Sequence, residues 1–177
     1  MNQYKVEEDF EYNGLRCVVA LMSMGHRCGY VGITKKHPLY GKDYDTNCPE
    51  LLKSEVEGEP IGERGIIPFL KPNDTEYMSP ECYFDVHGGI TYAGGGENSK
   101  YPVESNLWWF GFDCAHCEDS NDYDAALKYG IMTQEHYDYL TQMEWKYPTH
   151  GVIRTQEYVK DQCESLADQL NMIKGAN

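Results

Sequence analysis

The fold of this chain depends most on residues 6–33, which read VEEDFEYNGLRCVVALMSMGHRCGYVGI. Asn13-Gly14 separates two strand-like runs, Val6 to Tyr12 and Leu15 to Met22, and Asn-Gly is the strongest short-range signal of a β-hairpin. A second turn leads into a third run, Arg27 to Ile33. The middle run is almost continuously apolar, as a strand covered on both faces would be. Together these runs predict a three-stranded antiparallel meander.

The last third of the chain is predicted to be helical. Asp122 to Tyr129 fits a short helix that stops at Gly130, and Thr133 to Lys146 fits a longer one ended by Pro148. A final helix is expected from about Thr155 to Lys174.

The final helix has the clearest pattern. Apolar residues recur on it every three or four positions and form one stripe: Val159, Cys163, Leu166, Leu170 and Ile173. Thr155 is the expected N-cap and Gly175 the expected stop. We expect the stripe to cover one face of the sheet, and a dimer seam is the alternative.

Between these parts the chain is first irregular and then strand-like. Residues 34–80 are rich in Pro, Gly and charge, and they predict a long excursion with short ordered pieces near Leu51 and at Ile66 to Leu70. Residues 81–118 predict three central strands, at Cys82 to Val86, Ile90 to Ala93 and Leu107 to Phe112.

These elements predict one α+β domain over residues 1–177. The meander occupies residues 1–33 and the helical part residues 122–174, with the excursion and the central strands between them. The sheet is expected to be mostly antiparallel, with the C-terminal amphipathic helix over one face.

The composition disfavours several classes of protein. The chain has 15 Lys and Arg against 29 Asp and Glu, a formal net charge of -14, which disfavours nonspecific binding to nucleic acid or anionic lipid. No apolar run is long enough to span a membrane. Seven irregularly spaced cysteines behind a polar N-terminus indicate free thiols, and we expect a cytoplasmic protein.

One segment departs from this acidity. From Tyr12 to Lys42 the chain has Lys and Arg but no Asp or Glu, so a small anionic ligand is tolerated there. Aromatic rings can stack on a base while cations meet phosphate, although burial in the core is the alternative for the rings. The expected ligand-binding residues are Arg27, Tyr30, Lys35, His37, Tyr40, Lys42, His87, Gly88, Gly89, Trp109, Asp113 and His116.

Val86-His87-Gly88-Gly89 places a histidine before two glycines in strand-like sequence. Two glycines in a strand indicate a bulge or a close approach by a ligand or backbone. His87 is then either held by a neighbouring carbonyl or fixed where it contacts a polar ligand or moves a proton.

Asp113, Cys114 and His116 follow the aromatic run at Leu107 to Phe112. If the protein is an enzyme, Asp113 and His116 are catalytic candidates together with His87. In a continued strand the acid and the imidazole would point to opposite faces, and the alternative is a capped turn within a polar network.

Metal and thiol chemistry are both weakly supported. Cys114 and Cys117 have Cys-x-x-Cys spacing but no second ligand pair, and no familiar nucleophile motif surrounds Cys114. The acids from Glu118 to Asp124 lack the pattern of a calcium loop and fit a solvated turn and helix start. No metal or cofactor is therefore predicted.

Several strings together resemble small uncharacterised proteins encoded by bacteriophages and prophages. They are Arg27-Cys28-Gly29-Tyr30-Val31-Gly32, His37-Pro38-Leu39-Tyr40-Gly41, Val86-His87-Gly88-Gly89, Trp108-Trp109-Phe110-Gly111-Phe112-Asp113-Cys114-Ala115-His116 and Tyr158-Val159-Lys160. The resemblance spans residues 15–174 and implies an accessory, counter-defence role in the host cytoplasm.

Three functions stay open. The protein binds and sequesters a small anionic, nucleotide-like signal; or it inhibits a host nuclease as an acidic nucleic-acid mimic, like an anti-CRISPR protein; or it is a hydrolase that uses His87 and His116 as acid and base. We expect binding rather than catalysis, because no motif has the specificity of a known active site. The expected partner is an anionic ligand or a host defence protein, and self-association stays open.

Overall fold

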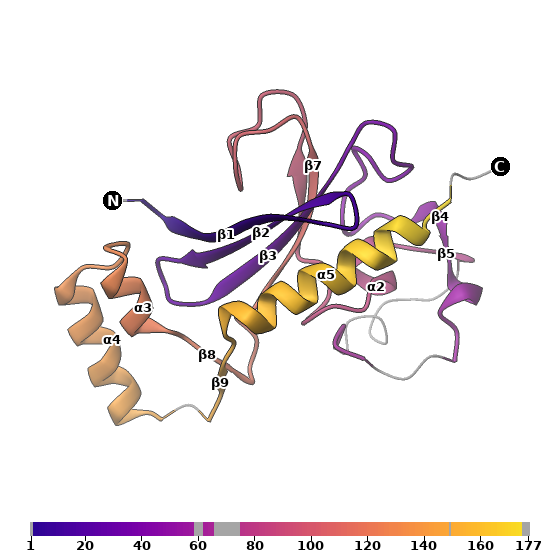
Figure 1. Ribbon diagram of the computed structural model, residues 1–177. Helices are drawn as coiled ribbons and strands as arrows, with labels where there is room; N and C mark the ends of the chain where they lie inside the picture. Colours follow the sequence, from indigo (N-terminus) through magenta and orange to yellow (C-terminus); the bar gives the residue numbers. More distant parts are fainter. Residues whose placement is uncertain (1, 59–61, 66–74, 149, 175–177) are drawn as a thin grey trace.

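The computed structural model describes residues 2–58, 62–65, 75–148 and 150–174 (Figure 1). Its main element is a five-stranded antiparallel sheet in the order β1-β2-β3-β7-β6. The strands are β1 (Tyr4–Tyr12), β2 (Leu15–Met22), β3 (Arg27–Ile33), β6 (Tyr92–Gly95) and β7 (Trp108–Asp113). The predicted meander is confirmed as the first three strands.

The turn between β1 and β2 follows directly from its two residues. Asn13 and Gly14 both have positive φ, 48° and 81°, which is the backbone that a two-residue type I′ hairpin requires. Tyr12 pairs with Leu15 across this turn. The register of the hairpin is therefore set locally.

Helix α5 (Gln156–Met172) lies across one face of the sheet (Figure 1). Its stripe is fully buried at Val159, Cys163, Leu166 and Leu170, and these side chains join the core cluster of Cys17, Val19 and Val31. The stripe is therefore core and not a dimer seam. Thr155 caps the helix as predicted, by accepting a hydrogen bond from the amide of Tyr158.

The opposite face of the sheet has its own, smaller core. Val18 and Ala20 of β2 pack there with Tyr30 and Trp109, and Tyr101 from the β6–β7 connection packs against them. The middle strand is thus covered on both faces, as its apolar sequence predicts. The α+β fold with a mostly antiparallel sheet and a covering C-terminal helix is confirmed.

Shorter elements complete the described parts of the chain. They are β4 (Cys48–Leu52), the 3-10 helix η1 (Lys53–Glu55), β5 (Tyr77–Met78), α2 (Pro80–Tyr83), β8 (Asp119–Ser120), α3 (Tyr123–Lys128), α4 (Gln134–Lys146) and β9 (Val152–Ile153). The predictions for α3 and α4 are confirmed, and Asp122 and Thr133 cap their N-termini. Parallel pairing of β8 with β9 holds the start of the helical part close to α5.

The strand predicted at Cys82 to Val86 is wrong. Pro80 begins α2, because its fixed φ suits the first position of a helix. Cys82, Phe84 and Val86 are buried alternately, so the period of two is real, but this segment forms no ladder with any strand in the described part of the chain.

Other boundaries also move. The strand predicted at Ile90 to Ala93 is β6, which starts at Tyr92 and continues to Gly95. The cap of α5 is Ile173, and the predicted stop at Gly175 lies outside the described residues, as do Ile66 to Leu70. None of the described helices combines the length and the apolar character needed to cross a membrane.

Candidate functional site

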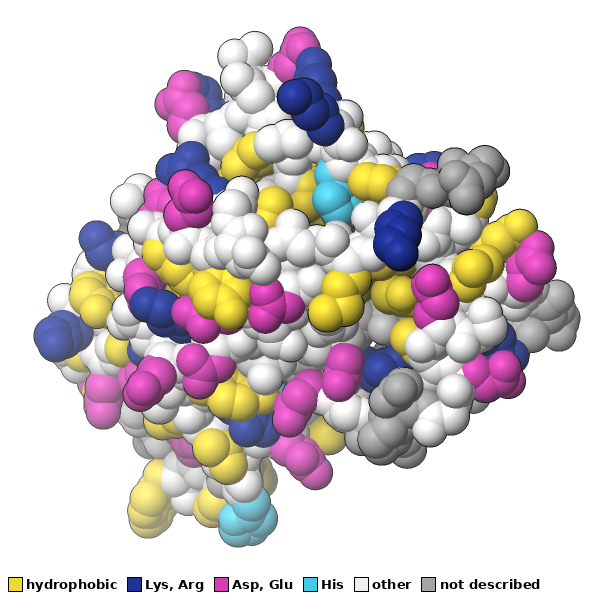
Figure 2. Space-filling model, turned by 45° about the vertical axis from the view of Figure 1, so that its right-hand side comes forward, with side chains coloured by type: hydrophobic (Ala, Val, Ile, Leu, Met, Phe, Trp, Pro, Cys, Tyr) yellow, Lys and Arg dark blue, Asp and Glu magenta, His cyan; other side chains and the backbone are white. Residues whose placement is uncertain are grey.

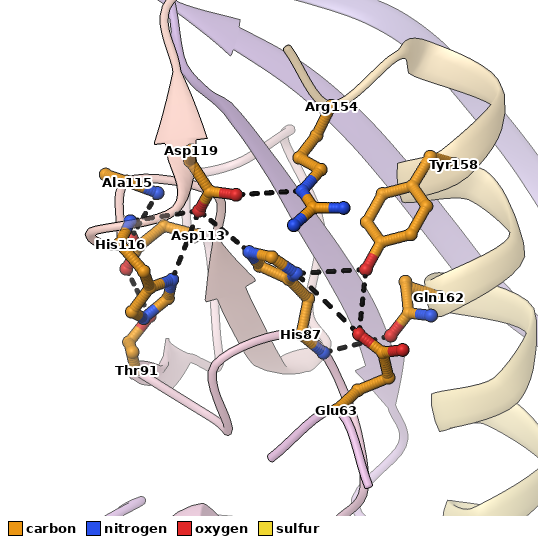
Figure 3. Close-up of polar contacts among 10 residues, drawn as sticks. All are labelled: Glu63, His87, Thr91, Asp113, Ala115, His116, Asp119, Arg154, Tyr158 and Gln162. Atoms are coloured by element: carbon orange, nitrogen blue, oxygen red, sulfur yellow. Dashed lines mark hydrogen bonds and ion pairs between the residues drawn. The ribbon is translucent and has the colours of Figure 1, made fainter. Parts of the chain in front are cut away.

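His87 lies at the centre of a polar cluster between the sheet edge and α5 (Figure 3). Its Nε2 is 2.8 Å from Oδ2 of Asp119, and its Nδ1 is 2.9 Å from the hydroxyl oxygen of Tyr158. The backbone amide of His87 donates to the side chain of Gln162 on α5. The imidazole is 8% exposed, so it is held on both ring nitrogens with little access to solvent.

Asp119 on β8 is the most buried charged group of the cluster, with a side chain only 2% exposed. Its Oδ1 accepts from Nε of Arg154 at 2.8 Å, and its Oδ2 accepts from the backbone amide of His116 at 2.9 Å. Burial by itself would raise the pKa of Asp119, but the hydrogen bonds from Arg154, His87 and the His116 amide outweigh it and lower that pKa below its usual value. The carboxylate is therefore ionised at neutral pH.

His116 contributes the second imidazole. Its ring centroid is 5.3 Å from that of His87, and its Nδ1 is 3.5 Å from Oδ2 of Asp119. This Nδ1 is buried and makes no hydrogen bond within the described residues. The rest of the side chain is more open, at 37% exposure. Among His87, His116 and Asp119, His116 is thus the residue that a ligand reaches most easily.

The two glycines after His87 make room for His116. A Cβ at Gly88 would lie 2.0 Å from Cε1 of His116, and φ is positive at both Gly88 (68°) and Gly89 (84°). The amide of Gly88 donates to the carbonyl of Glu63 at 2.7 Å. The sequence left a strand bulge or a close approach open for these glycines, and the structure shows the close approach, in a turn whose backbone lies against an imidazole.

Tyr158 and Arg154 form the outer layer of the cluster. The Tyr158 hydroxyl donates to Oε2 of Glu63 at 3.0 Å, and the Arg154 guanidinium lies over the Tyr158 ring, 5.0 Å from its centroid. Burial and the neighbouring Glu63 carboxylate raise the pKa of Tyr158 well above its usual value, so the phenol stays protonated. The Nη atoms of Arg154 donate no hydrogen bond to a side chain among the residues described.

Asp113 lies near His116 but serves a different purpose. It accepts from Thr91 Oγ1 at 2.7 Å and from the amide of Ala115 at 3.2 Å, on the far side of the His116 ring from Asp119 (Figure 3). Asp113 therefore supports the turn that carries His116, as in the structural alternative considered from the sequence.

The basic segment does not join this cluster. Each of three predicted cationic ligand groups is paired with a carboxylate: Arg27 with Glu7 and Asp122, Lys35 with Glu97, and Lys42 with Glu50. Lys35 lines a separate surface hollow of about 540 Å³. Arg27 borders the cluster, because its Nη1 donates to the backbone carbonyl of Arg154 at 3.0 Å, but its charge is paired with Glu7 and Asp122.

The remaining predicted ligand residues have structural partners. Tyr30 and Trp109 are buried in the core on the other face of the sheet, while Tyr40 packs against Trp108. His37 bonds through Nε2 to the carbonyl of Leu170, at the end of α5. These four side chains are therefore separate from the cluster around His87.

The cysteines do not supply a reactive group at the site. All seven are free, and Cys114 is 2% exposed. Burial, followed by the charge of Asp119, raises the pKa of the Cys114 thiol well above its usual value, which disfavours a nucleophilic thiolate. Cys117 is exposed, whereas Cys114 is buried.

Sequence reasoning missed four members of the cluster. Asp119 was grouped with solvated acids, and Arg154, Tyr158 and Glu63 were assigned no role. The spacing His-x-x-Asp from His116 to Asp119 is a local signal, since the amide of Asp119 bonds to the carbonyl of His116 across one turn. The other three come from parts of the chain that only the fold brings close.

Comparison of the chain with protein-family models, with curated proteins and with solved structures finds no match. The chemistry of the site is therefore inferred from its own geometry.

Proposed function

We propose that the protein is a hydrolase of small phosphoesters, with His87, His116 and Asp119 as its active site. The observation that carries this proposal is the convergence of two imidazoles on one buried, ionised carboxylate. Proteins seldom bury such a group for stability alone, because its desolvation is costly, whereas hydrolysis needs groups that hold and move protons at fixed positions.

The exposure of the side chains indicates where a substrate enters. His116 is 37% exposed, against 8% for His87 and 2% for Asp119, so a substrate meets His116 first. Arg154, 23% exposed, uses Nε for Asp119 and has its Nη atoms left for an anionic group. In this proposal Arg154 orients the phosphoryl group and Asp119 fixes the cluster.

The resemblance to phage and prophage proteins adds a biological setting. We propose that the protein acts against host defence and that its substrate is a nucleotide-like signal. The cluster around His87 supports the chemical part of this proposal, and the resemblance supports the setting.

Sequestration of the same anionic ligand is the second candidate function. It is favoured by the burial of two of the three central groups, because a single open imidazole beside a cationic group suffices for binding. The basic segment gives no further support to sequestration, because carboxylates neutralise the charges of Arg27 and Lys42.

The nucleic-acid mimic is less well supported. Figure 2 shows Lys and Arg side chains interspersed with Asp and Glu on the face in view, so this face is not continuously acidic. A mimic of nucleic acid needs a regular negative surface to compete for a basic groove.

One experiment separates these functions. The protein is incubated with an excess of phosphodiester, either bis(4-nitrophenyl) phosphate or a panel of cyclic nucleotides, and product is counted per protein molecule. We expect many turnovers for the natural sequence, loss of turnover in His116→Ala, and unchanged turnover in His136→Ala, a control at an exposed histidine of α4.

Other outcomes would favour the alternatives. Clearance of one equivalent of ligand without product indicates sequestration. Salt-sensitive association with a nuclease that is unaffected by His87→Ala indicates a mimic. The proposal would be overturned if the protein showed no turnover and bound no ligand at this cluster.

A further inference from the structure

Three electron-pair donors face one point at the centre of the cluster. His87, His116 and Asp119 each place one ligand atom within 4.8 Å of the other two. The atoms closest to Oδ2 of Asp119 are Nε2 of His87 and Nδ1 of His116. The two nitrogens are 2.8 Å and 3.5 Å from the carboxylate oxygen. In a tetrahedral zinc site with bonds of about 2.0–2.1 Å, neighbouring ligand atoms are about 3.3 Å apart. The two nitrogen–oxygen distances lie on either side of this value.

The hydrogen bonds of Tyr158 indicate which nitrogen of His87 carries a proton and which is left to bind a metal ion. The carboxylate of Glu63 only accepts hydrogen bonds, so the single hydroxyl proton of Tyr158 is donated to it. Nδ1 of His87, 2.9 Å from the same hydroxyl oxygen, must then carry a proton and donate. With Nδ1 protonated, Nε2 is the nitrogen of His87 that offers a lone pair to a metal ion. Without a metal ion, Nε2 donates a proton to Oδ2 of Asp119, and a metal ion would replace that proton.

A proton on Nε2 of His87 satisfies both Nε2 and Oδ2 of Asp119, but it leaves Nδ1 of His116 without a partner. Nδ1 of His116 is buried and has no hydrogen bond among the residues that the structure describes. Leaving such an atom without a partner is unfavourable, because the hydrogen bond that it makes to water in the unfolded chain is lost. A metal ion at the shared point uses all three lone pairs at once, which a proton cannot do.

The surrounding residues have the arrangement expected around metal ligands. Metal-bound histidines donate their other N–H to a fixed acceptor, and metal-bound carboxylates are themselves hydrogen-bonded. His87 has such an acceptor in Tyr158, which Glu63 holds in turn, while the second oxygen of Asp119 accepts from Arg154 (Figure 3).

We propose that His87, His116 and Asp119 bind a single divalent transition-metal ion, zinc or one of similar ligand preference, through Nε2, Nδ1 and Oδ2 respectively. Three protein ligands leave a coordination position open for water or for a phosphoryl oxygen. The exposed side of His116 is where that position opens to solvent.

This inference deepens the proposed hydrolase and rests on it for its chemical meaning. Metal-bound water releases one proton to solvent, and the hydroxide oxygen forms a bond to phosphorus. The P–O bond to the leaving alcohol breaks, and the alcohol oxygen takes up one proton. One water is consumed per ester, and no electron is transferred.

The site is tested by metal binding, independently of activity. The full chain is stripped with a chelator and titrated with Zn²⁺ by calorimetry and with Co²⁺ by visible absorption. We expect one ion to bind per chain. The visible absorption bands of bound Co²⁺ should be those of a low-coordinate site with nitrogen and oxygen ligands, and no thiolate charge-transfer band should appear. His116→Ala should reduce the affinity at least tenfold, and Cys117→Ala and His136→Ala should leave it unchanged.

His116→Ala is the principal variant because Nδ1 of His116 makes no hydrogen bond that the fold would lose; circular dichroism checks that the variant is folded. Absence of stoichiometric binding, an unchanged affinity in His116→Ala, or a thiolate band lost in Cys117→Ala would each overturn the metal site. Metal binding without turnover would retain the site and refute the hydrolase. Turnover by the metal-free protein would retain the hydrolase and refute the metal site.

Discussion

Nε2 of His87 and Oδ2 of Asp119 lie 2.8 Å apart, although 32 positions separate the two residues in the chain. The contact joins the turn after α2 to β8, and α5 closes the cluster from the other side through Tyr158 and Gln162. The Asp119 carboxylate accepts hydrogen bonds from three donors. Substitutions of Asp119 and of its neighbours should therefore have separable effects on stability and on metal binding.

Asp119→Asn should destabilise the fold by about 3–5 kcal/mol, because the change leaves Arg154 without its buried charge partner. Chemical denaturation measures the free energy of unfolding. Asp113→Asn is the matched control, with an expected cost of about 1 kcal/mol, since that carboxylate makes exposed hydrogen bonds to Thr91 and Ala115. Equal losses in the two variants would contradict the central position of Asp119.

Tyr158→Phe should weaken metal binding by about 10- to 100-fold, as expected when the acceptor of a metal-bound histidine is removed. The ring remains beneath Arg154, so packing is retained. Calorimetric titration with Zn²⁺ measures the change. Tyr139→Phe on the exposed side of α4 is the control and should bind metal normally. An affinity unaffected by Tyr158→Phe would exclude Tyr158 as a positioning residue.

Gly88→Ala should displace His116 and lower metal affinity. Its Cβ would lie 2.0 Å from Cε1 of His116, in addition to the strain of a positive φ. Gly41→Ala has a similar φ of 79° but nothing within 4 Å of the new Cβ, so it separates the two effects. Both variants should lose about 1–2 kcal/mol of stability through backbone strain, and only Gly88→Ala should lose metal affinity. The same metal affinity in both would argue against contact between Gly88 and His116.

Cys117 should be the only thiol that reacts rapidly with a thiol reagent at pH 8 in the folded protein. It is exposed, whereas the other six are buried. Burial raises the pKa of Cys17 to about 12, and the same cause raises that of Cys28 to about 12, so few thiolates form there. Cys117→Ala should abolish the rapid phase, and denaturant should expose all seven thiols in the natural sequence. Several fast thiols in the native state would refute this burial pattern.

The ion pair of Asp9 with Arg16 should make a small, acid-sensitive contribution to stability. The hydrogen bond from Arg16 lowers the pKa of Asp9 below 3.8 in the fold, so the pair stabilises fully above that value and is lost as pH falls through the lower folded pKa. Both groups are partly exposed, and we expect roughly 0.2–1 kcal/mol at neutral pH. The difference in unfolding free energy between the natural sequence and Asp9→Asn should shrink below pH 3.8. A difference that grows in acid would contradict this sign.

Local features of the fold could be predicted from the sequence because neighbours along the chain determine them. Asn13-Gly14 adopts positive φ wherever a tight hairpin is needed, and the apolar stripe of α5 follows from helical periodicity. The segment at Cys82 to Val86 marks the limit of such reasoning. Its alternating burial is genuine, but a strand also needs a partner strand, and none pairs with it among the residues that the structure describes.

Part of the candidate site could be predicted from the sequence. His87 and His116 were recognised from the chemistry of their side chains, and the structure brings them together. Arg27 and Lys42 were expected beside them, but a cation in an acidic chain finds the nearest carboxylate, and its position depends on folding. Asp119 looked like one of several solvated acids, because burial cannot be assigned from a turn-rich sequence.

The sequence by itself determined the hairpin, the helix caps and the two histidines, all of which depend on residues a few positions apart. Only the tertiary structure decided that Asp119, rather than Asp113, meets these histidines and that Tyr158, Arg154 and Glu63 surround them. The physical reason is that hydrogen bonds and metal-ligand geometry depend on side-chain positions to within fractions of an ångström. Pairing of β8 with β9 and packing of α5 against the sheet set those positions.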